Sequence, residues 1–237
     1  MKTLLLTNEY PPTIYGGAGV HVDYLSRGLA RHIDVEVRAF GDQDVVGNPT
    51  VKGFGLDASG FTCPKPLRSA FGAIRRCTDF NTTNIDADIV HCHTWYAHFG
   101  GILAKMNYGI PLVITVHSLE PLRPWKREQL GGGYDFTCWL EKTALEMADA
   151  VIAVSQGTKD DILSFFNIPE ERVPIIYNGI DLEEYHRVES RARIDRFGID
   201  PAKPYVLFVG RIARQKGIIH LVNAIKYFDP GFQVVLC

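Results

Sequence analysis

Three glycines near the start of the chain, Gly16, Gly17 and Gly19, separate an apolar run at 2–8 from a helix-like pattern. A strand followed by a glycine-rich turn and a helix suits anion binding, because backbone N–H groups and the helix dipole point at the ligand. The residues that follow nearly match the dinucleotide-binding fingerprint, but Val22 occupies the third glycine's place. This disfavours a nicotinamide site and leaves a phosphate-binding loop or a plain tight turn.

A second group of chemically capable residues lies in the stretch VHCHTWYAH, residues 90–98. On a strand, His91 and His93 are two residues apart and face the same side. Cys92 and His98 are near enough in sequence to suggest zinc, but zinc needs four ligands and no second cluster of suitable spacing follows. We therefore expect no metal site. Polar side chains at the carboxyl end of a parallel strand instead indicate a ligand cleft.

Further polar residues follow other apolar runs. His117 ends the run at 111–117, so its imidazole is expected at the same edge of the sheet. Asn178 belongs to an Asn-Gly pair, which is also typical of a plain turn. Arg211 and Lys216 follow the last clear apolar run, and a guanidinium together with an ammonium commonly binds a diphosphate.

Short apolar, β-branched runs alternate with stretches of helical period along most of the chain. Nearly continuous hydrophobic strands separated by helices predict a parallel sheet covered on both faces, which is an α/β fold. A short strand near 51–56 and a helix over 67–80 are also expected. The main strands are expected at 2–8, 33–40, 87–93, 111–117, 149–155 and 172–181.

Composition and charge narrow the functional class. The chain has 237 residues, of which 46% are hydrophobic and 22% charged, and its formal net charge is −2. No overall positive field therefore attracts nucleic acid. No run approaches the roughly 20 apolar residues of a membrane span, and the start lacks a secretory signal. Five widely spaced cysteines without a C-x-x-C pair are typical of reduced thiols, so we expect a cytoplasmic protein.

The pattern changes after Asp181. Residues 183–204 are charged and end in Pro-Ala-Lys-Pro, as a linker does. A fresh β-α-β unit starts at 205 and the sequence stops at 237, which is too short for a second domain. We expect a complete domain over 1–182, a linker over 183–204 and the incomplete opening of a second domain over 205–237.

The sequence contains, in this order, the stretches NEYPP…YGGAGVHV, IVHCHTWYAHFGG, TVHSLEPLRPWKREQLGGGY, WLEKTALEMADAVIAVS, YNGID and VGRIARQKG. Their order and spacing resemble those of retaining family 4 glycosyltransferases. More narrowly, they resemble bacterial and archaeal glycogen synthases, including relatives that make maltose 1-phosphate. The resemblance implies the GT-B architecture, in which two Rossmann-like domains face each other across a cleft.

The resemblance implies a hexosyltransferase that moves glucose from ADP-glucose or UDP-glucose to the 4-hydroxyl of an α-1,4-glucan, without a cofactor. The first domain would hold the acceptor and the second most of the nucleotide sugar. Two alternatives stay open. Either the acceptor is glucose 1-phosphate, with Arg123, Lys126 and Arg127 as a local basic cluster, or the chain is a non-catalytic glucan-binding module.

The resemblance also implies roles for individual residues. His117 is expected to contact the transferred glucose, and Arg211 and Lys216 to neutralise the leaving diphosphate. Such fixed cations stabilise the charge that develops on a leaving group. Retention is ascribed to attack from the leaving group's own face, without the paired carboxylates of glycosidases. The expected substrate-binding residues are Gly16 and Gly17 at the diphosphate, Asn178 near the sugar, Glu9 and Glu120 at the acceptor, Tyr15 and His93.

One part of the family pattern lies outside this sequence. The donor-side E-x7-E segment belongs to the later part of the second domain, after the point where the sequence stops. We therefore predict little or no transferase activity for the 237 residues alone, and an exposed strand edge within 205–237.

Overall fold

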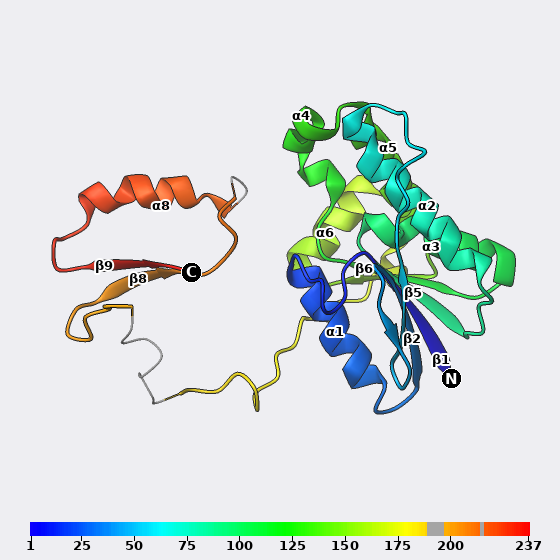
Figure 1. Cartoon of the computed structure of the whole chain (residues 1–237), viewed down its shortest axis with the longest axis horizontal. Helices are drawn as coiled ribbons and strands as arrows, with labels where there is room; N and C mark the ends of the chain where they lie inside the picture. Colours follow the sequence, from blue (N-terminus) through cyan, green and yellow to red (C-terminus); the bar gives the residue numbers. More distant parts are fainter. Residues whose placement is uncertain (189–196, 214–215) are drawn as a thin grey trace. The chain divides into compact units, whose positions relative to one another are not determined.

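The structure is a computed structural model that describes residues 1–188, 197–213 and 216–237. The chain forms two compact units, Met1–Gly179 and Ile180–Cys237, which Figure 1 shows coloured along the sequence. Residues 189–196 of the expected linker lie outside the described residues. The predicted domain boundaries therefore stay predictions.

The first unit is built on a seven-stranded sheet with the order β3-β4-β2-β1-β5-β6-β7. Neighbouring strands pair in parallel except for β3 and β4, which are antiparallel. The predicted α/β fold with a parallel sheet is thus confirmed. The strands are β1 (Lys2–Thr7), β2 (Asp34–Phe40), β3 (Asp44–Val45), β4 (Thr50–Phe54), β5 (Ile89–His93), β6 (Leu112–Val116) and β7 (Ala150–Ala153).

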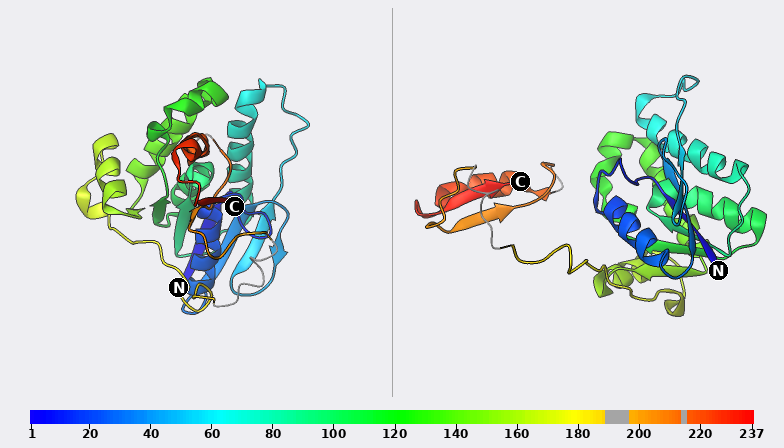
Figure 2. Two further views of the ribbon diagram at one scale, coloured as in Figure 1. Left: turned by 90° about the vertical axis from the view of Figure 1, so that its left-hand side faces the viewer. Right: turned by 60° about the horizontal axis from the view of Figure 1, so that its bottom comes forward.

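Helices cover both faces of this sheet (Figure 2). Helix α1 packs with β1 and β2 on one face, and α2, α3 and α5 supply side chains to the larger core on the other. None of the helices in the described ranges is both long and apolar enough to cross a membrane. The helices of this unit are α1 (Gly17–Leu29), α2 (Arg68–Thr82), α3 (Trp95–Tyr108), α4 (Arg127–Leu130), α5 (Gly132–Met147) and α6 (Gln156–Phe165).

Strand β1 shows how the sequence fills both cores. Leu4 and Leu6 belong to the larger hydrophobic cluster, whereas Leu5 belongs to the smaller one beneath α1. Successive side chains of a strand point to opposite faces, so an unbroken apolar run is what a strand covered on both sides requires. On the α3 side the packing is close, because a Cβ at Gly101 would lie 2.3 Å from Cys92 Sγ.

The order of the strands also fixes where a ligand cleft lies. From β1 the chain moves to β2 on one side, and it later returns to β5 on the other side of β1. In open α/β sheets, ligands bind outside the carboxyl ends of the strands at such a reversal of strand order. The residues just after β1, β5 and β6 therefore form the expected site.

One predicted strand is wrong. Within 172–181 the structure has a single isolated bridge, between Ala153 and Ile175. Pro174 has no N–H to contribute to a ladder, and only its carbonyl pairs, accepting from the Ala153 N–H at 3.0 Å. Beyond this bridge Tyr177 is exposed, so a strand gains no burial there.

The second unit contains β8 (Tyr205–Phe208), α8 (Ile218–Ala224) and β9 (Gln233–Leu236). Strands β8 and β9 pair in parallel, as a β-α-β unit requires. Apolar side chains on this small sheet are only partly covered, since Tyr205 and Leu207 are each 52% exposed.

Candidate active site

The centre of the candidate site is a pair of histidines at adjacent strand ends. His93 is the last residue of β5, and His117 follows β6 directly. The two strands are parallel neighbours, and His93 is in register with Thr115. This places the His93 Nδ1 atom 3.2 Å from the His117 Nε2 atom. The structure therefore brings together two residues that the sequence placed at one sheet edge.

His21, in the first turns of α1, completes this group, although no feature of the sequence pattern indicated it. Its ring centroid lies 4.7 Å from that of His117 and 5.4 Å from that of His93. His21 also forms a side-chain hydrogen bond with Asn178. The predicted sugar-binding residues His93, His117 and Asn178 thus converge around a helical residue.

His91 lies behind His93 on the same face of β5, as predicted, with ring centroids 4.3 Å apart. Its Nε2 atom is 2.8 Å from the Thr115 hydroxyl, which fixes the ring between the strands. The zinc cluster considered around 90–98 does not form, because Cys92 Sγ lies against the Ala97 carbonyl of α3 at 3.6 Å.

Burial keeps these imidazoles neutral. Desolvation lowers the pKa of His117 to about 4 and that of His91 to about 3. The pKa of His93 falls well below its usual range for the same reason, with smaller repulsion from the neighbouring histidines. Desolvation also lowers the pKa of His21. At neutral pH the cluster offers uncharged nitrogens that can donate to or accept from sugar hydroxyls, not cations.

The backbone bends sharply where β5 meets α3. Thr94 has φ 66°, in the left-handed region that a β-branched residue rarely adopts. Its hydroxyl donates to Asn8 Oδ1 at 2.7 Å, which ties the end of β5 to the segment after β1. Strained residues of this kind cluster at functional sites, and this one follows His93 directly.

The glycine loop forms the start of α1, with Gly16 as its N-cap residue. The Glu9 carboxylate sits on the loop, where its Oε2 atom accepts from the N–H of Tyr15 at 2.9 Å and of Gly16 at 2.7 Å. A Cβ at Gly19 would lie 2.8 Å from Glu9 Cβ, so glycine is needed for this approach. The predicted phosphate-binding amide of Gly16 thus has an anionic partner within the chain, while Gly17 is exposed.

The expectation that Glu120 contacts the acceptor does not match the structure. Its side chain is 1% exposed, and its carboxylate accepts from Lys126 Nζ at 2.7 Å and from the Thr137 hydroxyl at 3.3 Å. Its backbone N–H donates to Glu141 Oε2 at 2.7 Å. Glu120 is therefore an interior anchor for the segment after β6, because a buried carboxylate requires such partners.

Glu141 on α5 shares this interior. Desolvation, reinforced by the neighbouring Glu120 carboxylate, raises the pKa of Glu141 to about 8. The residues of the predicted basic cluster are paired with acidic side chains of this region. Lys126 pairs with Glu120, and Arg127 forms a two-pronged pair with Asp135 at 2.8 and 2.5 Å.

Arg211 and Lys216 lie in the second unit, exposed, between β8 and α8. Both flank 214–215, which are outside the described residues. Their predicted role at a leaving diphosphate stays a prediction.

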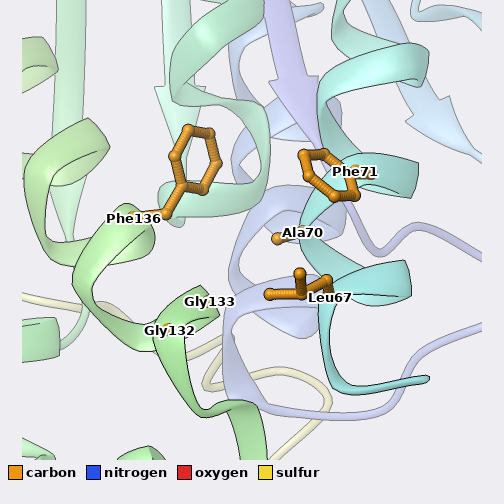
Figure 3. Close-up of a pocket in the computed structure, with 6 residues that line it drawn as sticks. All are labelled: Leu67, Ala70, Phe71, Gly132, Gly133 and Phe136. Atoms are coloured by element: carbon orange, nitrogen blue, oxygen red, sulfur yellow. The ribbon is translucent and has the colours of Figure 1, made fainter. Parts of the chain in front are cut away.

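The first unit also contains an apolar cavity of about 300 Å³ between α2 and α5 (Figure 3). No histidine of the cluster lines it. Its wall is almost entirely apolar, which separates it from the chemistry described above. It is lined by Leu67, Ala70, Phe71, Gly132, Gly133 and Phe136.

Comparison with known proteins identifies the family. Residues 15–184 match the description of Glycosyltransferase Family 4. The chain belongs to this family. Family 4 membership agrees with the sheet-edge histidines and the glycine loop, which lie within or at the border of the matched range.

Among curated relatives, the chain is 44% identical over its whole length to an α-maltose-1-phosphate synthase from Mycolicibacterium smegmatis, and it covers 60% of that protein. It is 26% identical over 95% of its length to a glycogen synthase from Mycobacterium tuberculosis, of which it covers 58%. Among solved structures, sucrose-phosphate synthase from Thermosynechococcus elongatus matches with a TM-score of 0.76 at 21% identity, covering 100% of this chain and 62% of that one. The fold is that of GT-B glycosyltransferases.

Proposed function

We propose that the protein transfers glucose from a nucleoside diphosphate glucose, ADP-glucose or UDP-glucose, to glucose 1-phosphate, forming α-maltose 1-phosphate in the cytoplasm. The observation that carries this proposal is the 44% identity to an α-maltose-1-phosphate synthase along the entire chain. The identity to a glycogen synthase, 26%, is much lower.

The segment after β6 supports a phosphorylated acceptor. It carries Arg123, Lys126 and Arg127, whose side chains are 26%, 18% and 58% exposed. An ammonium has three donors, so Lys126 retains two after its hydrogen bond to Glu120. Arg123 lies 3.8 Å from the same carboxylate, outside hydrogen-bond distance, and keeps its guanidinium donors for a phosphate.

The transfer itself needs no carboxylate nucleophile. In the proposed reaction the acceptor's 4-hydroxyl oxygen bonds to the anomeric carbon as the bond to the diphosphate breaks, and the hydroxyl proton passes to a diphosphate oxygen. Arg211 and Lys216 would stabilise the charge on that diphosphate. The neutral imidazole of His117 would hold a sugar hydroxyl.

A second candidate is extension of an α-1,4-glucan, as the name of the glycogen synthase relative suggests. It is supported by a match that extends over 95% of this chain, so the resemblance is not confined to one segment. The two candidates differ in the acceptor and therefore in the product, so one assay separates them.

In the assay, the protein is incubated with ADP-glucose or with UDP-glucose. Any sequence that continues beyond Cys237 is included in the protein used. Glucose 1-phosphate and maltoheptaose are offered in parallel, and products are identified by mass spectrometry and by the anomeric NMR signals. We expect α-maltose 1-phosphate. Extension of maltoheptaose alone would instead establish the second candidate, and failure of both would reject the transferase proposals.

A matched pair of variants tests the basic segment. Arg123→Met is expected to raise KM for glucose 1-phosphate by about tenfold to a hundredfold, the equivalent of one charge-assisted hydrogen bond. Arg31→Met, at an exposed arginine near the end of α1, should leave KM unchanged. Thermal melting of both variants verifies that the loss is not one of folding. An unchanged KM in folded Arg123→Met would contradict the role of this segment.

A further inference from the structure

Three imidazoles from separate elements converge at the carboxyl edge of the sheet. One ligand nitrogen from each of His21, His93 and His117 lies within 4.8 Å of the others. They come from α1, from the end of β5 and from the residue after β6, so the sheet topology and the α1 packing hold them together. We propose that these three side chains form a binding site for a divalent transition-metal ion such as Zn²⁺.

The distances fit such a site. Imidazole nitrogens bind zinc at about 2.0–2.1 Å, so two of them on a tetrahedral ion are about 3.3–3.4 Å apart. The His93 Nδ1 and His117 Nε2 atoms are already 3.2 Å apart. The ligand nitrogens all lie within 4.8 Å of one another, so the His21 nitrogen has to approach by at most about 1.5 Å, which side-chain rotation on a helix permits.

The surroundings fit a ligand set as well. Each imidazole has two nitrogens, so His21 can bond to Asn178 through one and to a metal ion through the other. A ligating histidine is commonly oriented in this way by a hydrogen bond at its second nitrogen. His93 is fully buried, whereas His21 and His117 are only partly covered. The fourth position of a tetrahedral ion therefore faces the outer side of the cluster, where water can complete the coordination.

The chemistry of the donors selects the class of ion. Three imidazoles suit Zn²⁺, Co²⁺, Ni²⁺ or Cu²⁺, whereas Mg²⁺ and Ca²⁺ prefer oxygen ligands. Without an ion, one nitrogen of the His93–His117 contact donates its N–H to the other. A metal ion at His93 Nδ1 and His117 Nε2 requires the donating ring to change tautomer, so that both nitrogens present a lone pair to the ion.

The consequence for activity rests on the proposed function. His117 is the residue expected to contact the transferred glucose, so an ion that binds its Nε2 atom would withdraw that nitrogen from the sugar. We therefore expect the ion to inhibit transfer. Binding of the ion itself does not depend on this function and is measured without any substrate.

The test uses the whole protein without an affinity tag, dialysed against a chelator and titrated with ZnCl₂ by calorimetry. A parallel titration with CoCl₂ monitors the visible bands of four-coordinate Co²⁺. We expect one ion per chain and an affinity at least tenfold lower in His21→Ala. His32→Ala, at an exposed histidine just after α1, is the matched control and should bind like the unchanged protein.

Two outcomes would overturn the site: no saturable binding by the folded protein, or equal binding by His21→Ala. His21 is partly exposed on a surface helix, so its truncation is expected to leave the fold intact, and circular dichroism verifies this. Metal binding without any transferase product would retain this site and reject the proposed function. Transferase product without metal binding would reject this site and retain the proposed function.

Discussion

Glu141 provides a quantitative test of how the interior beneath the segment after β6 is organised. We consider the substitution Glu141→Gln. It keeps a side-chain oxygen that accepts the Glu120 N–H, but it removes the ionisable carboxyl group. Burial raises the pKa of Glu141 from its ordinary value of 4.5 to about 8. The folded protein therefore holds a proton that the unfolded chain has already released, across the whole interval between these two values.

The sign follows from this difference. Because the folded state binds more protons, the free energy of unfolding of the unchanged protein falls as pH rises from 4.5 towards 8. Each pKa unit corresponds to about 1.4 kcal/mol. Between about pH 5 and about pH 7, Glu141→Gln should therefore gain roughly 2.5 kcal/mol relative to the unchanged protein, as an order of magnitude.

The measurement is urea unfolding of both proteins at several pH values. Only the difference between the two curves is interpreted, because the buried histidines titrate in both proteins. Those histidines have lowered pKa values, so they alone make stability rise with pH up to the ordinary histidine pKa of about 6.5. Glu171→Gln, at an exposed position, is the control and should run parallel to the unchanged protein. Parallel curves for Glu141→Gln would refute the protonated interior carboxyl.

Three further substitutions test other features. Gly101→Ala places a Cβ 2.3 Å from Cys92 Sγ, so it should lower the free energy of unfolding by about 1–3 kcal/mol, and Cys92→Ala in the same chain should restore part of this loss. Lys126→Met removes the closest cation from buried Glu120 and should cost about 3 kcal/mol in urea unfolding. Glu9→Ala frees the two loop amides that its carboxylate holds, so their hydrogen exchange should accelerate on the order of tenfold.

Matched controls separate these effects from general damage. Gly28→Ala lies in α1, where an added Cβ meets no atom within 4 Å, so it should not destabilise the protein. Lys142→Met removes a lysine that is 54% exposed and should change stability by less than about 1 kcal/mol. Asp23→Ala, on α1, should leave exchange at the loop amides unchanged. A destabilisation by Gly28→Ala as large as that by Gly101→Ala would contradict the packing argument.

The sheet could be predicted because its signal is local. Unbroken apolar runs such as Leu4–Leu6 require cover on both faces, and this requirement alone indicates parallel strands. Strand ends then place His93 and His117 at one edge, since parallel neighbours finish together. The error at 172–181 also has a local cause, because Pro174 removes a donor from an otherwise strand-like run.

Contacts between distant segments could not be predicted. His21 looks like any polar residue of an amphipathic helix, and only the packing of α1 on the sheet brings it to His117. Glu120 sits in a Pro-rich, charged stretch that indicates a solvent-exposed loop. Its burial depends on Thr137 and Glu141, which are contributed by a helix more than a dozen residues later.

The Glu9 carboxylate already occupies the amides of the glycine loop, so an anion that binds there has to replace this carboxylate. An incoming phosphate that uses the Gly16 amide has to displace a group that already carries negative charge and already accepts two N–H donors. Its affinity at these amides is the difference between two similar interactions, and this difference is small for a lone anion. The loop therefore discriminates against simple anions and favours a ligand that is also held elsewhere, so that the displacement is coupled to binding of the whole molecule.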